Sequence, residues 1–357
     1  MRILMIAVRN LDKGGIESYL MSIYRSLPDD IHIDFVIHSK DDGCYDEEVQ
    51  NNGSIIYRLP RLGKKPIKYC KLLYRIIKTG DYDIVHRHAT ASVMWVDLAV
   101  AKYAGCNNRI AHSHNADWNH RAIHKLFIPF LNHYSTLKFA CSNKAGKWMY
   151  GENSFQVMKN GINVNEFKFD NNIREEYRKK YNLDNKKIVL LVARMVPGKN
   201  HLWFLEVISE IVKEEENIIF VFAGDGELLE KFKKEVKERE LTKYTLILGS
   251  RNDISNLLSM SDVFVLPSLF EGLPITLIEA QCTGLPCLIS SNVTSEANLG
   301  LVKILELKTN LWKDSIINID IEDESKRSNS DAIIYNHNYS LEQTIKVLEE
   351  LYRKCLK

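Results

Sequence analysis

Short runs of apolar and β-branched residues alternate with longer stretches of helical periodicity along the whole chain. Runs of this kind are typical of strands that are buried on both faces, and their alternation with helices predicts βαβ units on parallel sheets. We expect strands in the first half at 2–8, 33–39, 54–59, 83–88, 109–114, 137–142 and 155–161. We expect strands in the second half at 187–194, 217–224, 244–250, 262–268 and 285–291.

The length of 357 residues is enough for two domains that each bury a core. The polar stretch 167–187 separates two similar halves and is the best candidate for a linker. The pattern therefore predicts an α/β protein with two Rossmann-like, doubly wound parallel-sheet domains that face a central cleft. We expect the domains at 1–168 and 169–340, followed by a helix at 341–357.

Composition and charge exclude several classes of protein. A formal net charge of +2 gives no support for a nucleic-acid partner, and no apolar run has the length of a membrane span. The N-terminal segment has the pattern of a strand and not of a signal peptide. The seven cysteines are scattered, which argues against a disulfide framework and is typical of a reducing cytoplasm. We expect a cytoplasmic enzyme.

Ligands of open parallel sheets bind outside the carboxyl ends of the strands, so the residues that follow each strand carry the most information. Gly14 and Gly15 precede a helix and would let backbone amides approach an anion. Arg194 and Lys199 flank a Pro-Gly turn after a strand, where two cations would suit a diphosphate. Gly224 ends another strand and would let a ligand lie close, whereas Asp225 is expected only to cap the next helix.

Two carboxylates in "LPSLFEGLPITLIEAQCTGLP" (266–286) need partners. Glu271 follows an apolar run in a loop, and Glu279 lies among apolar residues in the second turn of an expected helix. A charged Glu with apolar neighbours is costly unless a group hydrogen-bonds to it. The two positions can bracket one ligand from two sides.

The stretch E-G-L-P-I-T-L-I-E (271–279) resembles the EX7E motif of retaining glycosyltransferases of the GT-B fold, within glycosyltransferase family four. The "GGIE", "NGINVNEF" (160–167), Arg194/Lys199 and "FAGDG" segments occur in the order found in that family. The resemblance covers about residues 1–300, and the most similar subgroup assembles bacterial exopolysaccharides and capsules.

The resemblance implies a role for each matching residue. Glu279 would hold the ribose hydroxyls of a nucleotide-sugar, and Glu271 the hydroxyls of its sugar. Arg194 and Lys199 would grip the diphosphate, so that Glu271, Arg194, Lys199 and His112 form the catalytic set. The donor would also contact the backbone or side chains of a further group: Gly14, Gly15, Gly224, Gly272 and Leu273. The acceptor side would include Glu17, His114 and Asn115.

The same resemblance implies retention of configuration, a helix from 341 that crosses back onto the first domain, and no cofactor or metal. The co-substrate would be a nucleotide diphosphate-sugar, with a UDP-sugar expected. The acceptor would be a glycan, expected to be lipid-linked.

Histidines leave an alternative open. His86 and His88 lie on one strand, and His112 and His114 alternate at the end of another, so each pair could form half of a metal site. We favour the donor site for His112, but a metal-dependent hydrolase remains an alternative. Within the same fold, a nucleotide-sugar epimerase or a non-catalytic partner subunit would share the motifs.

The helix expected at 64–78 carries six cations and an apolar face. It is either a surface helix or a docking site for the anionic inner face of the cell membrane. The apolar stretch 124–134 is either acceptor contact or core.

Overall fold

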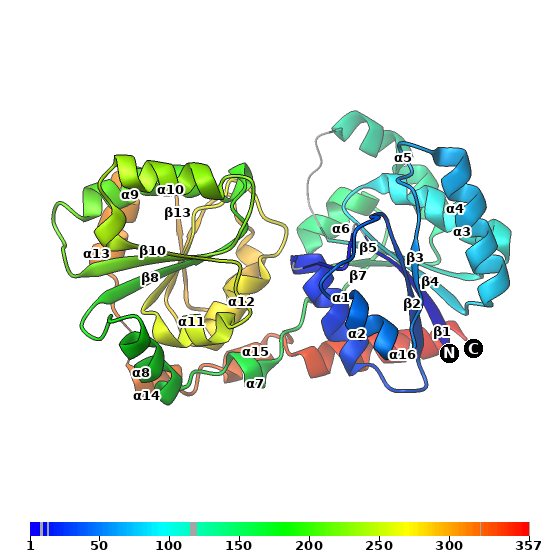
Figure 1. Ribbon diagram of the computed structural model, residues 1–357. Coiled ribbons are helices and arrows are strands. Elements are labelled where there is room, and N and C mark those ends of the chain that lie inside the picture. Colours follow the sequence, from blue (N-terminus) through cyan, green and yellow to red (C-terminus); the bar gives the residue numbers. More distant parts are fainter. Residues whose placement is uncertain (8–9, 13, 115–119, 322, 357) are drawn as a thin grey trace. The chain divides into compact units, whose positions relative to one another are not determined.

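The computed structural model describes residues 1–7, 10–12, 14–114, 120–321 and 323–356. The chain forms two compact units, which are described separately (Figure 1). Unit 1 contains residues 1–161 and 341–357, and unit 2 contains residues 162–340. The division falls between Gly161 and Ile162, whereas the sequence suggested 168 and 169.

The described part of unit 1 contains a parallel sheet with the strand order β3-β2-β1-β4-β5-β6-β7. Its strands are β1 (Arg2–Ile6), β2 (His32–Ile37), β3 (Ile56–Arg58), β4 (Ile84–Ala89), β5 (Asn108–Ser113), β6 (Leu137–Ala140) and β7 (Gln156–Val157). Its helices are α1 (Gly15–Ser26), α2 (Asp46–Asn51), α3 (Pro66–Gly80), the short η1 (Ser92–Met94), α4 (Trp95–Ala104), α5 (Arg121–Tyr134), α6 (Asn143–Tyr150) and α16 (Leu341–Cys355).

The described part of unit 2 contains a second parallel sheet with the order β10-β9-β8-β11-β12-β13. Its strands are β8 (Lys187–Val192), β9 (Ile218–Ala223), β10 (Thr245–Gly249), β11 (Val263–Leu266), β12 (Cys287–Ser290) and β13 (Val302–Leu305). Its α-helices are α7 (Val164–Phe167), α8 (Asn171–Lys180), α9 (His201–Ile211), α10 (Leu229–Glu238), α11 (Ile254–Met260), α12 (Ile275–Cys282), α13 (Thr309–Ile317), α14 (Glu324–Arg327) and α15 (Ala332–Asn336). Three short helical turns complete the unit: η2 (Pro197–Lys199), η3 (Thr242–Tyr244) and η4 (Ser295–Ala297).

Both sheets reverse their strand order at an internal pair. In unit 1 the neighbours β1 and β4 separate strands that were added in opposite directions, and in unit 2 the neighbours β8 and β11 do so. Such switch points open a crevice at the carboxyl ends of the strands, where ligands bind in open α/β sheets. Arg194 follows β8 and Glu271 follows β11, so both lie at the switch point of unit 2.

The two parallel-sheet α/β domains expected from the hydrophobic pattern are confirmed. Most strands are buried because both faces of each sheet carry helices, which agrees with their short apolar runs (Figure 1). Strand β13 was not expected, because two of its four residues are exposed and its sequence does not alternate.

The polar stretch 167–187 is not a linker. Its central part forms α8, which packs on α11 inside unit 2. The guanidinium groups of Arg174 and Arg178 both donate to the buried carboxylate of Asp262, with Arg178 Nη2 2.6 Å from each oxygen. The charged residues that suggested a solvated connection therefore form a buried ion-pair cluster.

Helix α16 belongs to unit 1, although it follows unit 2 in the sequence. It contacts α1, and the guanidinium group of Arg353 donates to both oxygens of Asp30 at 2.9 and 3.0 Å. The hydroxyl of Tyr352 lies 2.6 Å from Nδ1 of His86 inside the unit. Among the described residues, no helix is both long and apolar enough to cross a bilayer.

Candidate functional site

The loop after β8 presents one unpaired cation. Arg194 is exposed, and its side chain has no hydrogen-bond or ion-pair partner within the described ranges. The turn of η2 follows it, and the Gly198 carbonyl accepts from the Leu269 amide at 2.8 Å, which fastens this loop to the loop after β11. A Cβ atom on Gly198 would lie 2.9 Å from the Phe270 ring, so glycine permits this contact. The loop is thus fixed while its guanidinium group stays available for an anion.

Glu271 has two partners of its own unit. The ammonium group of Lys199 donates to its Oε1, and the hydroxyl of Ser268 donates to the same atom at 2.9 Å. The side chains of Lys199 and Glu271 are 23% and 11% exposed. These contacts satisfy the partly buried carboxylate that the sequence left without a partner.

The "FAGDG" turn has a structural reason for its glycines. Gly224 has φ +147° and Gly226 φ +153°, and a Cβ atom on them would lie 1.9 Å from the Ala193 carbonyl and 2.6 Å from the Met195 carbonyl. The ends of β8 and β9 could not approach each other with larger residues. Asp225 does not cap α10, which begins at Leu229; its carboxylate instead accepts from the Gly226 amide at 2.6 Å.

Glu279 lies in the second turn of α12, as expected, and is partly buried. Burial, together with the nearby carboxylate of Glu166, raises the pKa of Glu279 to about 8. Glu166 lies in α7, which is held against α12 because the Thr283 hydroxyl donates to the Phe167 carbonyl at 2.9 Å. The carboxyl group receives no hydrogen bond from the described residues, and its raised pKa shows that its charge is poorly compensated. It is therefore suited to accept hydrogen bonds from the hydroxyl groups of a ligand.

Gly272 and Leu273 connect Glu271 to the N-cap of α12 at Pro274, and both are buried. Their backbone lies between the two glutamates in the chain. Their assignment to a donor site stays a prediction.

In unit 1, the helix α1 begins where the two glycines predicted it. Gly14 is its N-cap, and a Cβ atom on Gly14 would meet only the flexible carboxylate of Glu17. A Cβ atom on Gly15 would meet no atom within 4 Å. Packing within the described structure therefore does not require glycine at position 15.

The two histidines of β5 differ in position. His112 lies within β5 and is fully buried, whereas His114 follows the last residue of the strand and is 8% exposed. Of the two, His114 lies nearer to the carboxyl edge at which ligands of such sheets bind. Asn115 lies outside the described residues.

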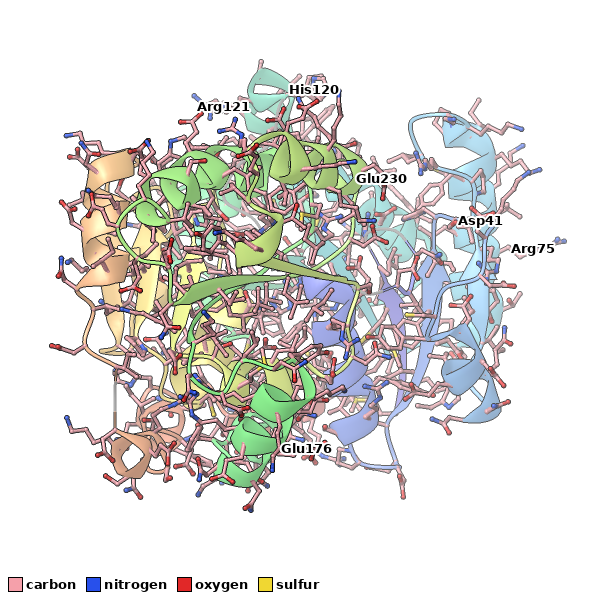
Figure 2. The ribbon with its side chains drawn as sticks, turned by 60° about the vertical axis from the view of Figure 1, so that its left-hand side comes forward. Asp41, Arg75, His120, Arg121, Glu176 and Glu230 are labelled. Carbon is pink, nitrogen blue, oxygen red and sulfur yellow. The ribbon has the colours of Figure 1, made fainter. Side chains whose placement is uncertain are left out.

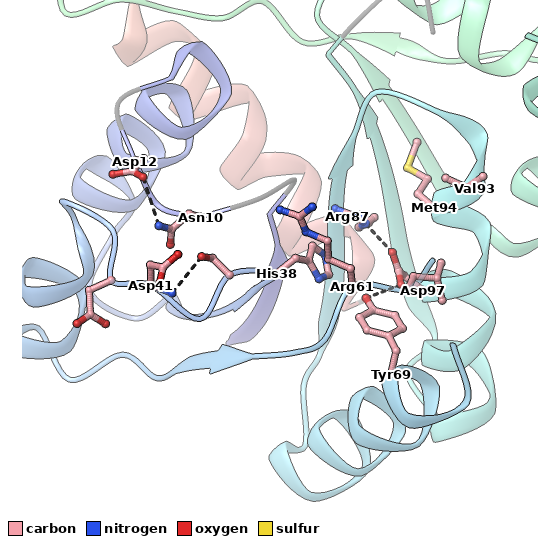
Figure 3. Close-up of a pocket in the computed structure, with 13 residues that line it drawn as sticks. Asn10, Asp12, His38, Asp41, Arg61, Tyr69, Arg87, Val93, Met94 and Asp97 are labelled. Carbon is pink, nitrogen blue, oxygen red and sulfur yellow. Dashed lines mark hydrogen bonds and ion pairs between the residues drawn. The ribbon is translucent and has the colours of Figure 1, made fainter. Parts of the chain in front are cut away.

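A pocket of about 770 Å³ lies at the carboxyl ends of the first four strands of unit 1 (Figure 3). Its floor holds a buried network in which Asp97 accepts from the Arg87 guanidinium at 2.6 Å and from the Tyr69 hydroxyl at 2.7 Å. Burial lowers the pKa of His38 to about 4, so its imidazole is neutral, and its Nδ1 is buried with no hydrogen-bond partner in the described structure. The lining is completed by polar, charged and apolar side chains: Asn10, Asp12, Ser39, Asp41, Asp42, Arg61, Leu62, Val93 and Met94.

Sequence patterns did not single out this pocket. Its residues come from the loops after β1, β2 and β3 and from β4, η1, α3 and α4. The loop after β1 leads into the Gly14-Gly15 motif, but those two glycines do not line the pocket. Ser268 and Glu166 were missed for a different reason. Ser268 lies two residues after the end of β11, and Glu166 lies in the "NGINVNEF" segment. Their places in the sequence could have pointed to them, whereas a serine and an exposed glutamate are too common to do so.

The basic segment 64–78 forms α3 and the residues before it. Its apolar stripe of Tyr69, Leu73 and Ile77 is buried, while its cations are exposed: Lys64, Lys65, Lys68, Lys71, Arg75 and Lys78. Arg75 projects away from the helix (Figure 2). Ile67, with 73% of its surface exposed, adds an apolar side chain to this outer face. In α5, Leu126 and Phe130 are also exposed, so the stretch 124–134 is not all core.

Two family profiles match consecutive parts of the chain. Residues 13–166 match "Glycosyltransferase Family 4", and residues 173–298 match "Glycosyl transferases group 1".

Relatives align over most or all of the chain. EpsF of Bacillus subtilis, which is named as a glycosyltransferase, is 29% identical over 96% of this chain and 94% of its own. The capsular polysaccharide biosynthesis glycosyltransferase CapH of Staphylococcus aureus is 28% identical over 96% of both chains. The UDP-Gal:alpha-D-GlcNAc-diphosphoundecaprenol alpha-1,3-galactosyltransferase of Escherichia coli is 34% identical over 64% of this chain and 62% of its own.

Among solved structures, Alr3699/HepE of Anabaena, in complex with UDP and glucose, has a TM-score of 0.82. It is 18% identical, and the match covers 98% of this chain and 99% of that protein. The likeness confirms the expected GT-B fold.

Proposed function

We propose that the chain is a retaining transferase with a nucleotide diphosphate-sugar donor. It belongs to the glycosyltransferases of family 4 and group 1, because two consecutive parts of it match the two family profiles. The observation that carries this proposal is the set of charges at the β8/β11 switch point: the unpaired Arg194 and the Lys199–Glu271 pair. Their positions match the motif residues that the family uses for its donor.

The chemistry needs cations that are already in place. When the glycosidic bond breaks, negative charge grows on the departing diphosphate, and fixed cations stabilise that charge without rearrangement. Arg194 supplies one such cation. Lys199 can supply a second when hydroxyl groups of the donor sugar take over its hydrogen bond to Glu271. The proposal includes no metal, since two cations can do this work.

Glu279 is assigned to the ribose of the donor. Two vicinal hydroxyls would donate to its oxygens and offset the cost of burying the carboxylate. The UDP bound by HepE is the reason to expect a UDP-sugar.

Unit 1 is assigned to the acceptor. Its pocket mixes carboxylates, a neutral imidazole and apolar side chains, which suits the hydroxyls and ring faces of a sugar. The E. coli relative is named for a diphosphoundecaprenol acceptor. We therefore assign a lipid-linked glycan acceptor in exopolysaccharide or capsule assembly to this chain, consistent with the name of CapH.

A lipid-linked acceptor requires the enzyme to work at the membrane surface. The exposed cations of α3, together with Ile67, would bind anionic headgroups at the inner face of the membrane. The enzyme would then be cytoplasmic and peripheral.

The first experiment is a screen of nucleotide-sugars by thermal shift, with and without EDTA. The proposal expects one nucleotide diphosphate-sugar to raise the melting temperature equally under both conditions. That donor is then incubated with and without an undecaprenyl diphosphate-linked sugar, and the anomeric configuration of the product is read by NMR. Consumption of the donor without an acceptor would identify an epimerase instead. No response to any nucleotide under either condition would contradict the proposal.

A further inference from the structure

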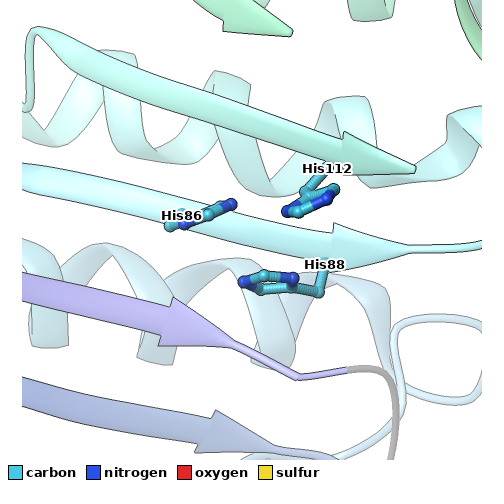
Figure 4. Close-up of side chains that lie close together, drawn as sticks. All are labelled: His86, His88 and His112. Atoms are coloured by element: carbon cyan, nitrogen blue, oxygen red, sulfur yellow. The ribbon is translucent and has the colours of Figure 1, made fainter. Parts of the chain in front are cut away.

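Unit 1 holds a buried cluster of histidines on one face of its sheet. His86 and His88 point to the same side of β4 because they are two residues apart, and His112 is paired in register with His88 on the neighbouring strand β5. Their ring centroids are 4.1 Å (His86–His88), 5.0 Å (His88–His112) and 5.4 Å (His86–His112) apart. The three side chains lie close together (Figure 4), and all three are fully buried. The donor chemistry and the acceptor pocket described above use neither His86 nor His88, and an ion held by His112 would replace the donor-site role that the sequence suggested for that residue.

One nitrogen of each of two rings has a partner. Nδ1 of His86 lies 2.6 Å from the Tyr352 hydroxyl, and Nδ1 of His88 lies 2.8 Å from Nε2 of His114. The remaining nitrogens have none: within the described structure, Nε2 of His86, Nε2 of His88 and both nitrogens of His112 are buried without a hydrogen bond. Buried nitrogen atoms without a partner are unusual in proteins, so this cluster calls for a further ligand.

The two hydrogen bonds fix which lone pairs of the cluster stay free. A neutral imidazole has one N–H and one lone pair. If Nδ1–H of His86 donates to Tyr352 and Nδ1–H of His88 donates to His114, the lone pair of each Nε2 is left free.

We propose that His86, His88 and His112 bind one transition-metal ion, with Zn²⁺ as the expected occupant. One nitrogen from each ring lies within 4.8 Å of the others. Imidazole is a good ligand for Zn²⁺, Cu²⁺ and Ni²⁺, and three histidines with a fourth, small ligand form a common zinc site. Zn–N bonds of about 2.0–2.1 Å place tetrahedral ligand nitrogens about 3.3 Å apart, so the rings must turn inward on binding.

Tyr352 and His114 would then act as positioning residues. A ligating histidine usually donates its second N–H to a neighbouring acceptor, which fixes the tautomer and the ring orientation. The two Nδ1 contacts described above have that geometry. Because Tyr352 lies on α16, the ion would join strands β4 and β5 to this helix through His86.

The role of the ion would be structural and not catalytic. The Tyr19 ring from α1 covers the cluster at 5.8 Å from His112, and Tyr352 covers it from α16. No histidine of the three has exposed surface through which a substrate could reach the ion. The ion would therefore enter during folding or when α16 opens, and the expected readout is the stability of unit 1.

The test uses the full chain without a histidine tag. The protein is unfolded with a chelator and refolded with Co²⁺ or Zn²⁺, and bound metal is measured after desalting. The proposal expects one ion per chain, a tetrahedral Co²⁺ absorption band and a melting temperature several degrees above that of metal-free protein. A refolded wild-type protein without bound ion, or with an octahedral Co²⁺ spectrum, would overturn the proposal.

Variants locate the ion. His88→Gln and His86→Gln should each weaken binding at least tenfold, and Tyr352→Phe should weaken it less. The matched control is His201→Gln: His201 is a buried histidine of unit 2 with both ring nitrogens unpartnered in the described structure, but it packs against Phe222 and Phe232 and not against other histidines. Unchanged binding in both ligand variants would refute the assignment. If a variant does not fold, the wild-type stoichiometry and Co²⁺ spectrum decide.

Discussion

The ammonium group of Lys199 and the carboxylate of Glu271, 72 residues apart in the chain, form an ion pair at the switch point of unit 2. Each ion is thereby held in place before any ligand arrives. Donor binding must exchange this contact for new ones, which makes the pair a test of the proposed function.

Removing either member should reduce turnover. We expect Lys199→Ala to lower kcat by about 10²–10³, because one fixed cation is lost from the departing diphosphate. Glu271→Ala should lower turnover while leaving UDP affinity unchanged or slightly higher, since Lys199 is released for the diphosphate. Steady-state kinetics and calorimetry with UDP measure the two effects. Lys213→Ala, which breaks an exposed pair with Glu210, is the control and should change neither value.

Glu279 should make stability depend on pH. Its pKa is about 8 in the folded protein and near 4.5 when the chain is unfolded, so the folded state binds more protons between these values. The free energy of unfolding should therefore fall as pH rises from about 5 to 8, by at most about 1.4 kcal/mol per pH unit. Urea unfolding of Glu279→Gln should show a weaker dependence. Equal slopes in both proteins would contradict the raised pKa.

Glu279 should also contribute to nucleotide binding. Glu279→Ala should weaken UDP binding, because the ribose hydroxyls lose their acceptor. Unchanged affinity in calorimetry would refute the ribose assignment, whatever happens to turnover.

Two glycines should differ strongly in how much stability the same substitution costs. Gly224→Ala places a Cβ atom 1.9 Å from the Ala193 carbonyl at a positive φ, and should cost at least about 2–3 kcal/mol of stability. Gly15→Ala meets no atom within 4 Å and should change stability by less than about 0.5 kcal/mol. Thermal unfolding of the two variants measures both effects.

The cations of α3 should control membrane binding. Each contributes about 1 kcal/mol near an anionic surface, so Lys68→Ala, Lys71→Ala and Arg75→Ala together should weaken binding to phosphatidylglycerol vesicles by about 10². The matched control replaces three exposed lysines of α10, namely Lys233, Lys234 and Lys237, with alanine. Sedimentation that is equally reduced in both triple variants would show that net charge, and not this helix, drives binding.

The fold was predictable because burial on both faces imposes continuous apolar runs on most strands. β8 and β9 show this pattern clearly, whereas β13 does not, since it lies at the edge of its sheet with Lys303 and Ile304 exposed. The segment around α8 was wrongly predicted to be a linker. Its arginines look solvated in the sequence, and only the tertiary structure brings them to Asp262.

The candidate site was predictable where a charged residue lies in the loop that follows a strand. Arg194 and Glu271 could be found in that way. The partner that raises the pKa of Glu279 could not, because Glu166 lies in a different segment that packs on α12. Gly224 shows a further limit: its sequence context suggested room for a ligand, while the structure shows that it makes room for the Ala193 carbonyl.

The return of α16 to unit 1 has a consequence for how the chain is made. During synthesis, residues 1–161 leave the ribosome long before Tyr352 and Arg353 exist to contact His86 and Asp30. Unit 2 is contiguous and can fold in that interval, but the nascent unit 1 must wait with the α16 side of its histidine cluster uncovered. Unit 1 is therefore synthesised first but completes its folding last. Until α16 docks, an ion or a chaperone can reach the histidine cluster.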